Sequence, residues 1–209
     1  MDIGPILSEM PSLPTRIEVE GKKFWPRAFA YIIDLIVMNL TSFATGLIGI
    51  YAFNFVLYLI LGAFGYWADM SNPSNYYINF AFGIVVNLIY FILFEALTGA
   101  TPGKLILRMR VTTLSGDRPS LKAVTIRALW RLFDGLFFGL VAAAAMTIPL
   151  QQRHGDKRAM TIVIGSNSLI LRYKPSFLQF ILATLIYLLS SSVIQALQTL
   201  TYTTFQPLP

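Results

Sequence analysis

Residues 78–97 read INFAFGIVVNLIYFILFEAL and carry a single charged side chain, Glu95. A helix of this length rises about 30 Å at 1.5 Å per residue, which matches the hydrocarbon core of a bilayer. The stretch lies inside a longer one, Ala28 to Gly103, that contains no lysine or arginine, although the chain has 16 such residues. A soluble domain needs charged surface throughout. The distribution therefore predicts a protein whose segments are sorted by a lipid bilayer.

The composition and the other apolar segments indicate the same class. The chain is 56% hydrophobic and 12% charged, as is typical of polytopic membrane proteins. Further spans are expected from Ala28 to about Ile48 and from about Phe177 to Leu200, and no charge follows Lys174. The predicted fold class is an all-α polytopic membrane protein, a small helical bundle of about three to five membrane helices.

Two segments leave the number of crossings open. The stretch 47–67 is apolar but interrupted by glycines, and a crossing there would place the basic residues after Gly103 on the outer side. The positive-inside rule opposes that, so we expect 49–67 to be interfacial or re-entrant on the outer face. Residues 121–150 form either one crossing or a helical hairpin broken at Gly135 or Gly139. We favour the hairpin because it keeps all 16 lysines and arginines cytoplasmic.

A short cytoplasmic β-hairpin-like element is expected beside the helices. Arg108–Thr113 is β-branched and precedes a turn, and Met160–Ile164 and Ser168–Arg172 are similar segments that could pair with it. Just before it, Thr101 and Pro102 have the residue types of a helix cap and a first helical position. The sequence therefore predicts a small folded element between the membrane segments.

Charged residues recur with the same spacing in two apolar segments. Residues 27–34 read RAFAYIID and residues 127–134 read RALWRLFD, with arginine, alanine and aspartate at the same offsets. An aspartate inside lipid costs roughly 2.5–3.5 kcal/mol on insertion scales, so it needs a partner. Arg27 lies about 10 Å along the helix from Asp34, at 1.5 Å per residue, so a cation on another helix suits that acid better. We expect crossed pairs, Arg127 or Arg131 with Asp34, and Arg27 with Asp134.

Glu95 lies near the cytoplasmic end of its span and is expected to hydrogen-bond the loop 98–104. The acids of these segments are either proton carriers or parts of a structural clamp between helices, and the clamp is the commoner use of matched arginine and aspartate. The candidate charge network, structural or ion-coupling, comprises Arg27, Asp34, Glu95, Arg127, Arg131, Asp134 and Asp156.

These segments resemble the RDD family, named for an arginine and two aspartates. The matching pieces are 27–34, Phe94-Glu95 to Thr101-Pro102-Gly103-Lys104, Arg108-Met-Arg-Val111 before Ser115-Gly116, 127–134, and Gly155-Asp156 with Ala159 and Thr161. The resemblance carries the three family residues onto Arg27, Asp34 and Asp134, with Asp156 as the alternative for the third. It implies a membrane protein, with cation/proton antiport associated with some members.

The resemblance divides the chain into a cytoplasmic N-terminal arm (1–23), a membrane domain (24–165) and an extension with an additional membrane helix (166–209). We expect a multi-pass protein of the cell (cytoplasmic) membrane, with the N-terminus cytoplasmic and the C-terminus on the outer side. The basic residues lie beside apolar segments, where anionic headgroups explain them, so nucleic acid is not an expected partner.

The sequence contains no catalytic triad, metal-ligand cluster or dinucleotide fingerprint, so neither an enzyme nor a cofactor or metal site is expected. Two functions remain open. The first is an accessory or structural subunit that associates with other membrane protein subunits or with itself through small and polar residues of the last span. The alternative is a cation/proton secondary transporter that acts as an oligomer, with Asp34 and Asp134 as the carriers.

Overall fold

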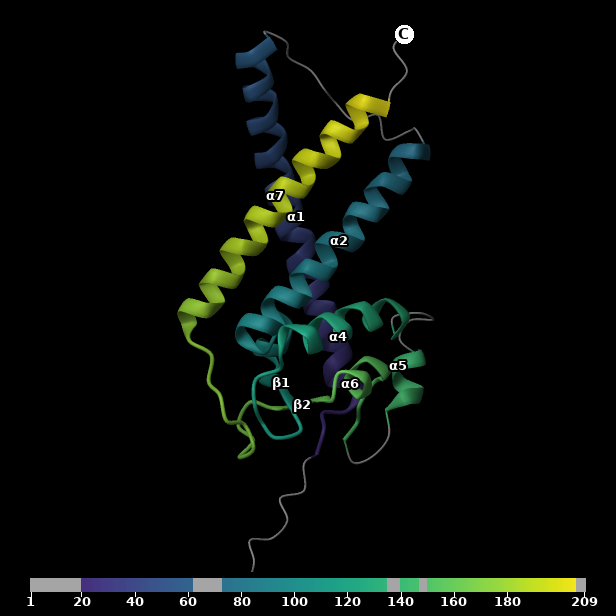
Figure 1. Cartoon of the computed structure of the whole chain (residues 1–209), viewed down its shortest axis with the longest axis vertical. Coiled ribbons are helices and arrows are strands. Elements are labelled where there is room, and N and C mark those ends of the chain that lie inside the picture. Colours follow the sequence, from purple (N-terminus) through teal and green to yellow (C-terminus); the bar gives the residue numbers. More distant parts are fainter. Residues whose placement is uncertain (1–19, 62–72, 135–139, 147–149, 206–209) are drawn as a thin grey trace, which may run out of the picture.

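Three long helices form the stem of the molecule. The structure, a computed structural model, describes residues 20–61, 73–134, 140–146 and 150–205. Helices α1 (Phe24–Leu61), α2 (Pro73–Thr98) and α7 (Phe177–Phe205) run along the long axis (Figure 1). Within the described residues each holds one segment that is long and apolar enough to cross a membrane: Phe24–Leu47, Tyr77–Thr98 and Phe177–Gln198. The predicted class, a small helical membrane bundle, is confirmed.

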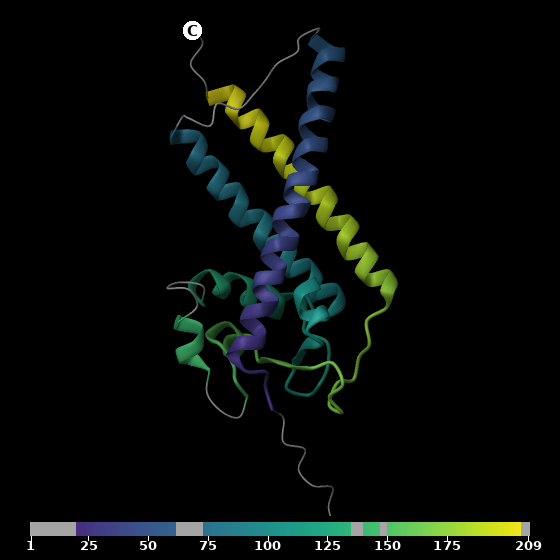
Figure 2. The same ribbon diagram turned by 180° about the vertical axis from the view of Figure 1, so that it is seen from behind.

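Helix α7 packs against both other long helices, and α1 and α2 diverge above their shared base (Figure 2). At the base, the aromatic rings of Tyr90 and Tyr187 meet edge to face with centroids 5.1 Å apart. Higher up, the Thr45 and Ser191 hydroxyl groups of α1 and α7 lie 3.2 Å apart. The Gln195 amide donates to the Ser42 carbonyl oxygen at 3.1 Å. Ser191 and Gln195 of α7 thus bind α1, because interhelical hydrogen bonds stabilise packing where water is absent.

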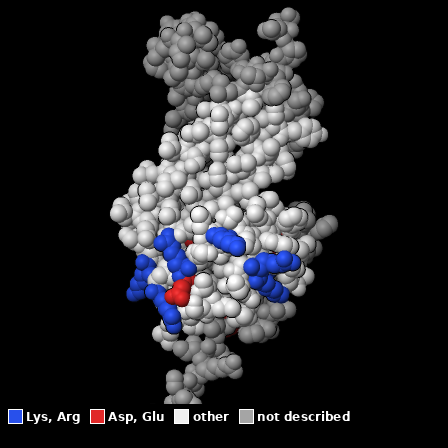
Figure 3. Space-filling view, in the orientation of Figure 1, with Lys and Arg blue, Asp and Glu red and all other residues white. Residues whose placement is uncertain are grey.

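The remaining elements form a basic lobe, defined as the described residues of 102–165, at one end of the stem. In chain order they are α3 (Pro102–Ile106), β1 (Met109–Thr113), α4 (Leu121–Asp134), α5 (Leu140–Ala145), α6 (His154–Arg158) and β2 (Thr161–Gly165). Lysine and arginine atoms gather over this end, whereas the part of the stem that Figure 3 draws in white shows no charged atoms. This separation is the charge pattern that a bilayer imposes.

The predicted strand pair is present. Strands β1 and β2 are antiparallel, with Val111 opposite Val163, and both of these side chains are fully buried. The third candidate segment, 168–172, is not a strand. The predicted helix start is also present, since α3 begins at Pro102 and Thr101 has the extended backbone of a cap residue.

Of the two ambiguous segments, 49–61 differs from its prediction, whereas the described part of 121–150 is divided into two helices, as the favoured hairpin requires. Residues 49–61 do not form a separate interfacial segment: α1 continues through them as one helix to Leu61, because Gly46 and Gly49 do not interrupt the apolar helical run. Residues 62–67 lie outside the described residues. In 121–150, α4 lies across the base of the stem and α5 is a separate short helix (Figure 1), so the described residues form no single crossing there. Gly135 and Gly139 lie outside the described residues.

Gly103 allows α3 to approach α1 closely. A Cβ atom at this position would overlap the Ala30 carbonyl oxygen and lie 3.0 Å from the Asp34 carboxylate carbon. Backbone atoms cannot move aside as the end of a flexible side chain can. The contact therefore requires glycine.

We expect Gly103→Ala to destabilise the protein by about 1–3 kcal/mol, because the added methyl group forces α3 away from α1. The melting temperature in detergent measures this. Gly83→Ala is the matched control, since a Cβ at Gly83 meets nothing within 4 Å. An equal loss in the two variants would contradict the close approach.

Candidate functional site

Glu95 is the acidic centre of a buried charge network at the junction of stem and lobe. It stands near the end of α2 and is 1% exposed. Its carboxylate accepts hydrogen bonds from Arg127 Nε at 2.9 Å and from Arg131 Nη2 at 2.8 Å. Lys104 Nζ of α3 is a third ion-pair partner. The prediction that Glu95 bonds the loop 98–104 is confirmed for Lys104. The sequence did not predict that Glu95 also binds two arginines of α4.

Asp156 is the second acidic centre and connects the lobe to α1. Its carboxylate accepts hydrogen bonds from Arg27 Nη1 at 2.5 Å and from Arg127 Nη1. It also caps the start of α6 by accepting the Arg153 backbone N–H at 3.2 Å. Arg127 therefore binds both acidic centres with one guanidinium group, a geometry for which its planar set of donors is suited.

Asp34 is held by uncharged donors, so its predicted pairing with Arg127 or Arg131 is wrong. The Tyr90 and Thr101 hydroxyl groups donate to it at 2.9 and 2.5 Å. The Gly103 backbone N–H donates at 2.7 Å. Helix α4 carries the two arginines across the base toward Glu95, while α3 covers Asp34.

The predicted pair of Arg27 and Asp134 is also wrong. Asp134, at the end of α4, lies 3.4 Å from His154 Nδ1, and Arg27 turns to Asp156 instead. Asp156, the alternative third residue, is thus the acid that the structure brings to Arg27. The sequence repeat predicted the wrong partners because equal spacing along two helices does not make their residues face each other when the helices cross.

The lobe side of the network stays charged at neutral pH. Burial lowers the pKa of Lys104 to about 8, although the neighbouring Glu95 opposes this shift. Burial also disfavours the charge on Arg127, but Asp156 and Glu95 raise the pKa of its guanidinium above the ordinary value. Burial alone would raise the pKa of Asp156, yet Arg127 and Arg27 hold it well below its usual range. The groups act as permanent charges that hold one another.

Several members of the site were not predicted as such: Tyr90, Thr101, Lys104 and Thr161. Thr101 and Lys104 stand in the block TPGK at 101–104, whose helix-start pattern was visible in the sequence. Thr161 Oγ1 accepts a hydrogen bond from Arg127 Nη1 at 2.6 Å. A hydroxyl group in an apolar helix, as in Tyr90, gives no signal of its partner until the helices are packed.

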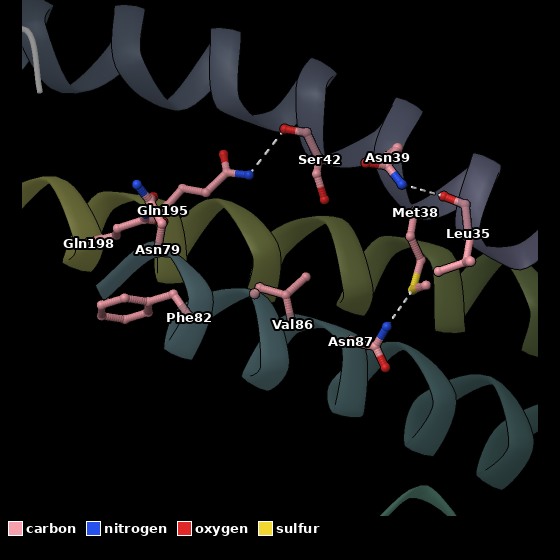
Figure 4. A pocket seen from close by; sticks show the side chains of 11 residues that line it. Leu35, Met38, Asn39, Ser42, Asn79, Phe82, Val86, Asn87, Gln195 and Gln198 are labelled. Carbon is pink, nitrogen blue, oxygen red and sulfur yellow. Dashed lines mark hydrogen bonds between the residues drawn. The ribbon is translucent and has the colours of Figure 1, made fainter. Parts of the chain in front are cut away.

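A second feature is an open groove between α1 and α2, with α7 along its floor (Figure 4). It encloses about 290 Å³ and no lining residue is charged. Six of its residues carry amide or hydroxyl groups: Asn39, Ser42, Asn79, Asn87, Gln195 and Gln198. The Asn87 amide points toward Met38 and donates to its sulfur at 3.7 Å, while the Asn39 amide bonds its own helix at Leu35 (Figure 4). The groove exposes amides within the membrane-spanning region.

A family model described as the RDD family matches residues 22–205. The chain belongs to this family, and the predicted resemblance is confirmed. The match includes all three spans and the whole basic lobe. No match to the chain is found among the curated proteins or the solved structures.

We expect Glu95→Gln to destabilise the protein by about 3–5 kcal/mol, because three buried cations lose their shared counter-charge. The midpoint of thermal unfolding in detergent measures this. Asp117→Asn is the control, since that acid lies on an exposed turn of the lobe and bonds Ser115.

Adding Lys104→Met to Glu95→Gln should recover part of the loss, because it removes one of the uncompensated charges. If the two residues act independently, the double variant will be less stable than Glu95→Gln by the full amount that Lys104→Met costs in the wild type. That result would contradict the network.

Proposed function

We propose that this member of the RDD family is a non-enzymatic accessory subunit that holds other membrane protein subunits. The main support is the way its acids are used. Asp34 accepts three hydrogen bonds, Glu95 binds three cations and Asp156 binds two arginines. Charges engaged in this way are suited to clamping the lobe onto the stem, and separating them would leave buried charges unpaired.

The groove between α1 and α2 is the docking surface in this proposal. Its amides lie where lipid offers no hydrogen bonds, so a polar side chain on a partner's membrane helix would find donors and acceptors there. Such interhelical bonds contribute about 0.6–2 kcal/mol each. The open side of the groove and the absence of charge among its lining residues suit a neutral helix better than an ion.

The proposed orientation places the basic lobe on the cytoplasmic side of the cell membrane. Lysine and arginine concentrate at this end of the stem (Figure 3), and the positive-inside rule then sets the direction of each span. The start of α1 lies at the lobe and the end of α7 at the opposite end of the stem (Figure 1). The chain thus enters α1 from the cytoplasm and leaves α7 on the outer side.

Cation/proton exchange by an oligomer is the alternative function, and one observation favours it. Among the described residues, Asp34 has no cation within ion-pair distance although it is 1% exposed in the middle of the fold. An ionisable side chain inside a membrane span that has no charged partner is a candidate ion-coupling group.

The first test is to extract the native protein in mild detergent, measure the particle mass and identify the chains that co-purify. We expect stoichiometric partners and a mass well above a small multiple of 23.4 kDa. The paired variant Asn39→Leu with Asn87→Leu should release the partner, because it removes both amides without adding bulk to the α7 contact. Thr184→Val is the control, since its hydroxyl bonds its own helix at Phe180, outside the groove lining. A particle of this chain alone would contradict the accessory role.

Asp34→Asn separates the two functions. In the accessory proposal it lowers stability by about 1–3 kcal/mol, because the amide nitrogen cannot accept from Tyr90, Thr101 or Gly103. Tyr90→Phe should produce a smaller loss in the same direction. Proton flux into vesicles that contain the purified protein tests the alternative. Flux in the wild type that disappears in a well-folded Asp34→Asn variant would establish transport instead.

A further inference from the structure

The charge network holds more donors than its carboxylates accept. Arg27 Nε and Nη2 and Arg131 Nε and Nη1 are buried and have no hydrogen-bond partner among the described residues. Each of these two residues is 7% exposed. Arg127 Nη2 and Arg153 Nε are likewise buried and have no hydrogen-bond partner among the described residues. A buried guanidinium with unmet donors is costly, more so than a neutral group, so an acceptor is expected close by.

The charges of the network show the same imbalance. Five cations, Arg27, Lys104, Arg127, Arg131 and Arg153, surround the three carboxylates of Asp34, Glu95 and Asp156, which leaves a surplus of two positive charges. Asp134 beside His154 balances one of them at most. A water molecule would satisfy donors but not this charge. An anion does both.

A small cavity lies among these side chains. Four of the cations line it from four different parts of the fold: Arg27 of α1, Lys104 of α3, Arg131 of α4, and Arg153 before α6. Asp34 also lines the cavity, with its carboxylate occupied by its three donors. The Arg131 guanidinium is fixed by stacking 3.4 Å over the ring of Phe91. The site is therefore built by the tertiary fold and its cations are held in place.

The cavity lies at the depth of lipid headgroups. Arg27 is in the first turn of the span Phe24–Leu47, between Trp25 and Phe29, which are 69% and 55% exposed. Exposed aromatic residues at a span end mark the membrane interface. Tyr31 of the same span also lines the cavity and is exposed, so part of the lining lies on the membrane-facing side of α1.

We propose that this cavity binds the phosphate group of an anionic phospholipid. Its enclosed space of about 20 Å³ admits little more than one water-sized group, so one phosphate oxygen enters while the rest of the lipid stays outside. Arginine donors and a lysine charge are the usual means of phosphate recognition, and basic pockets beside membrane helices bind anionic headgroups. The proposal does not depend on the accessory function, since it rests on the cavity lining and its unpartnered donors alone.

Arg153→Gln is the variant that tests the site. Arg153 is the least buried of the four cations, and its ion pair with Asp156 is long at 3.9 Å, so its removal should leave the fold intact. Lys122→Gln is the matched control, because it removes one positive charge from an exposed position of the lobe outside the cavity. Melting without ligand verifies that both variants are folded.

The measurement is the rise in melting temperature of the detergent-solubilised protein with short-chain phosphatidylglycerol, short-chain phosphatidylcholine or inorganic phosphate. For the wild type and for Lys122→Gln, we expect phosphatidylglycerol to raise the melting temperature more than phosphatidylcholine or inorganic phosphate does. Its apparent affinity should fall at least about tenfold in Arg153→Gln, as expected for one lost charge-assisted bond. Native mass spectrometry of the wild type should show a retained anionic phospholipid.

Each outcome bears on the proposal. Equal stabilisation by inorganic phosphate, with no lipid retained, would keep the phosphate site but assign it to free phosphate rather than to a lipid. An Arg153→Gln variant that responds to phosphatidylglycerol like the wild type would overturn the site. So would a wild type that responds to none of the three and retains no phospholipid, because the donors would then be satisfied by water alone.

Discussion

The fold depends on one buried guanidinium. Arg127 is 1% exposed and binds Glu95 of α2 and Asp156 of α6, while Asp156 also binds Arg27 of α1. Four elements, α1, α2, α4 and α6, are thereby joined through charges that burial makes costly to separate. Replacing such a pair by apolar residues can be neutral, so the network specifies how the lobe is seated more than it adds to stability.

The membrane determines where this network can form. Ion pairs at the end of the stem keep their charges near the interface, where they cost less than in the hydrocarbon core. Asp34, which lies further along α1, is instead bonded to hydroxyl and backbone donors. Above it, the hydrogen bonds between the described residues of α1 and α7 join neutral polar groups such as Thr45, Ser191 and Gln195. The change from charged to neutral partners follows the expected fall in polarity along the span.

The central position of α7 has a consequence for function. It contacts both α1 and α2, and these two helices separate above the base, which leaves the groove between them open and lined by amides. Among the serine and glutamine residues of α7 that by sequence suggested docking to another protein, Ser191 and Gln195 contact α1 and Gln198 contacts Asn79 of α2. The amides of α1 and α2 take over the proposed docking role, while the cavity among the cations is the proposed phosphate site.

The sequence by itself determined the membrane class, the three spans, the strand pair and the helix start at Pro102, because each follows from local composition and spacing. It also contained the acids and arginines of the network. Only the tertiary structure decided their partners, pairing Arg127 with Glu95 and Asp156 and leaving Asp34 to neutral donors. Pairing depends on the direction in which α4 crosses the base of the stem, and that direction is set by packing between distant segments, which spacing along the chain does not encode.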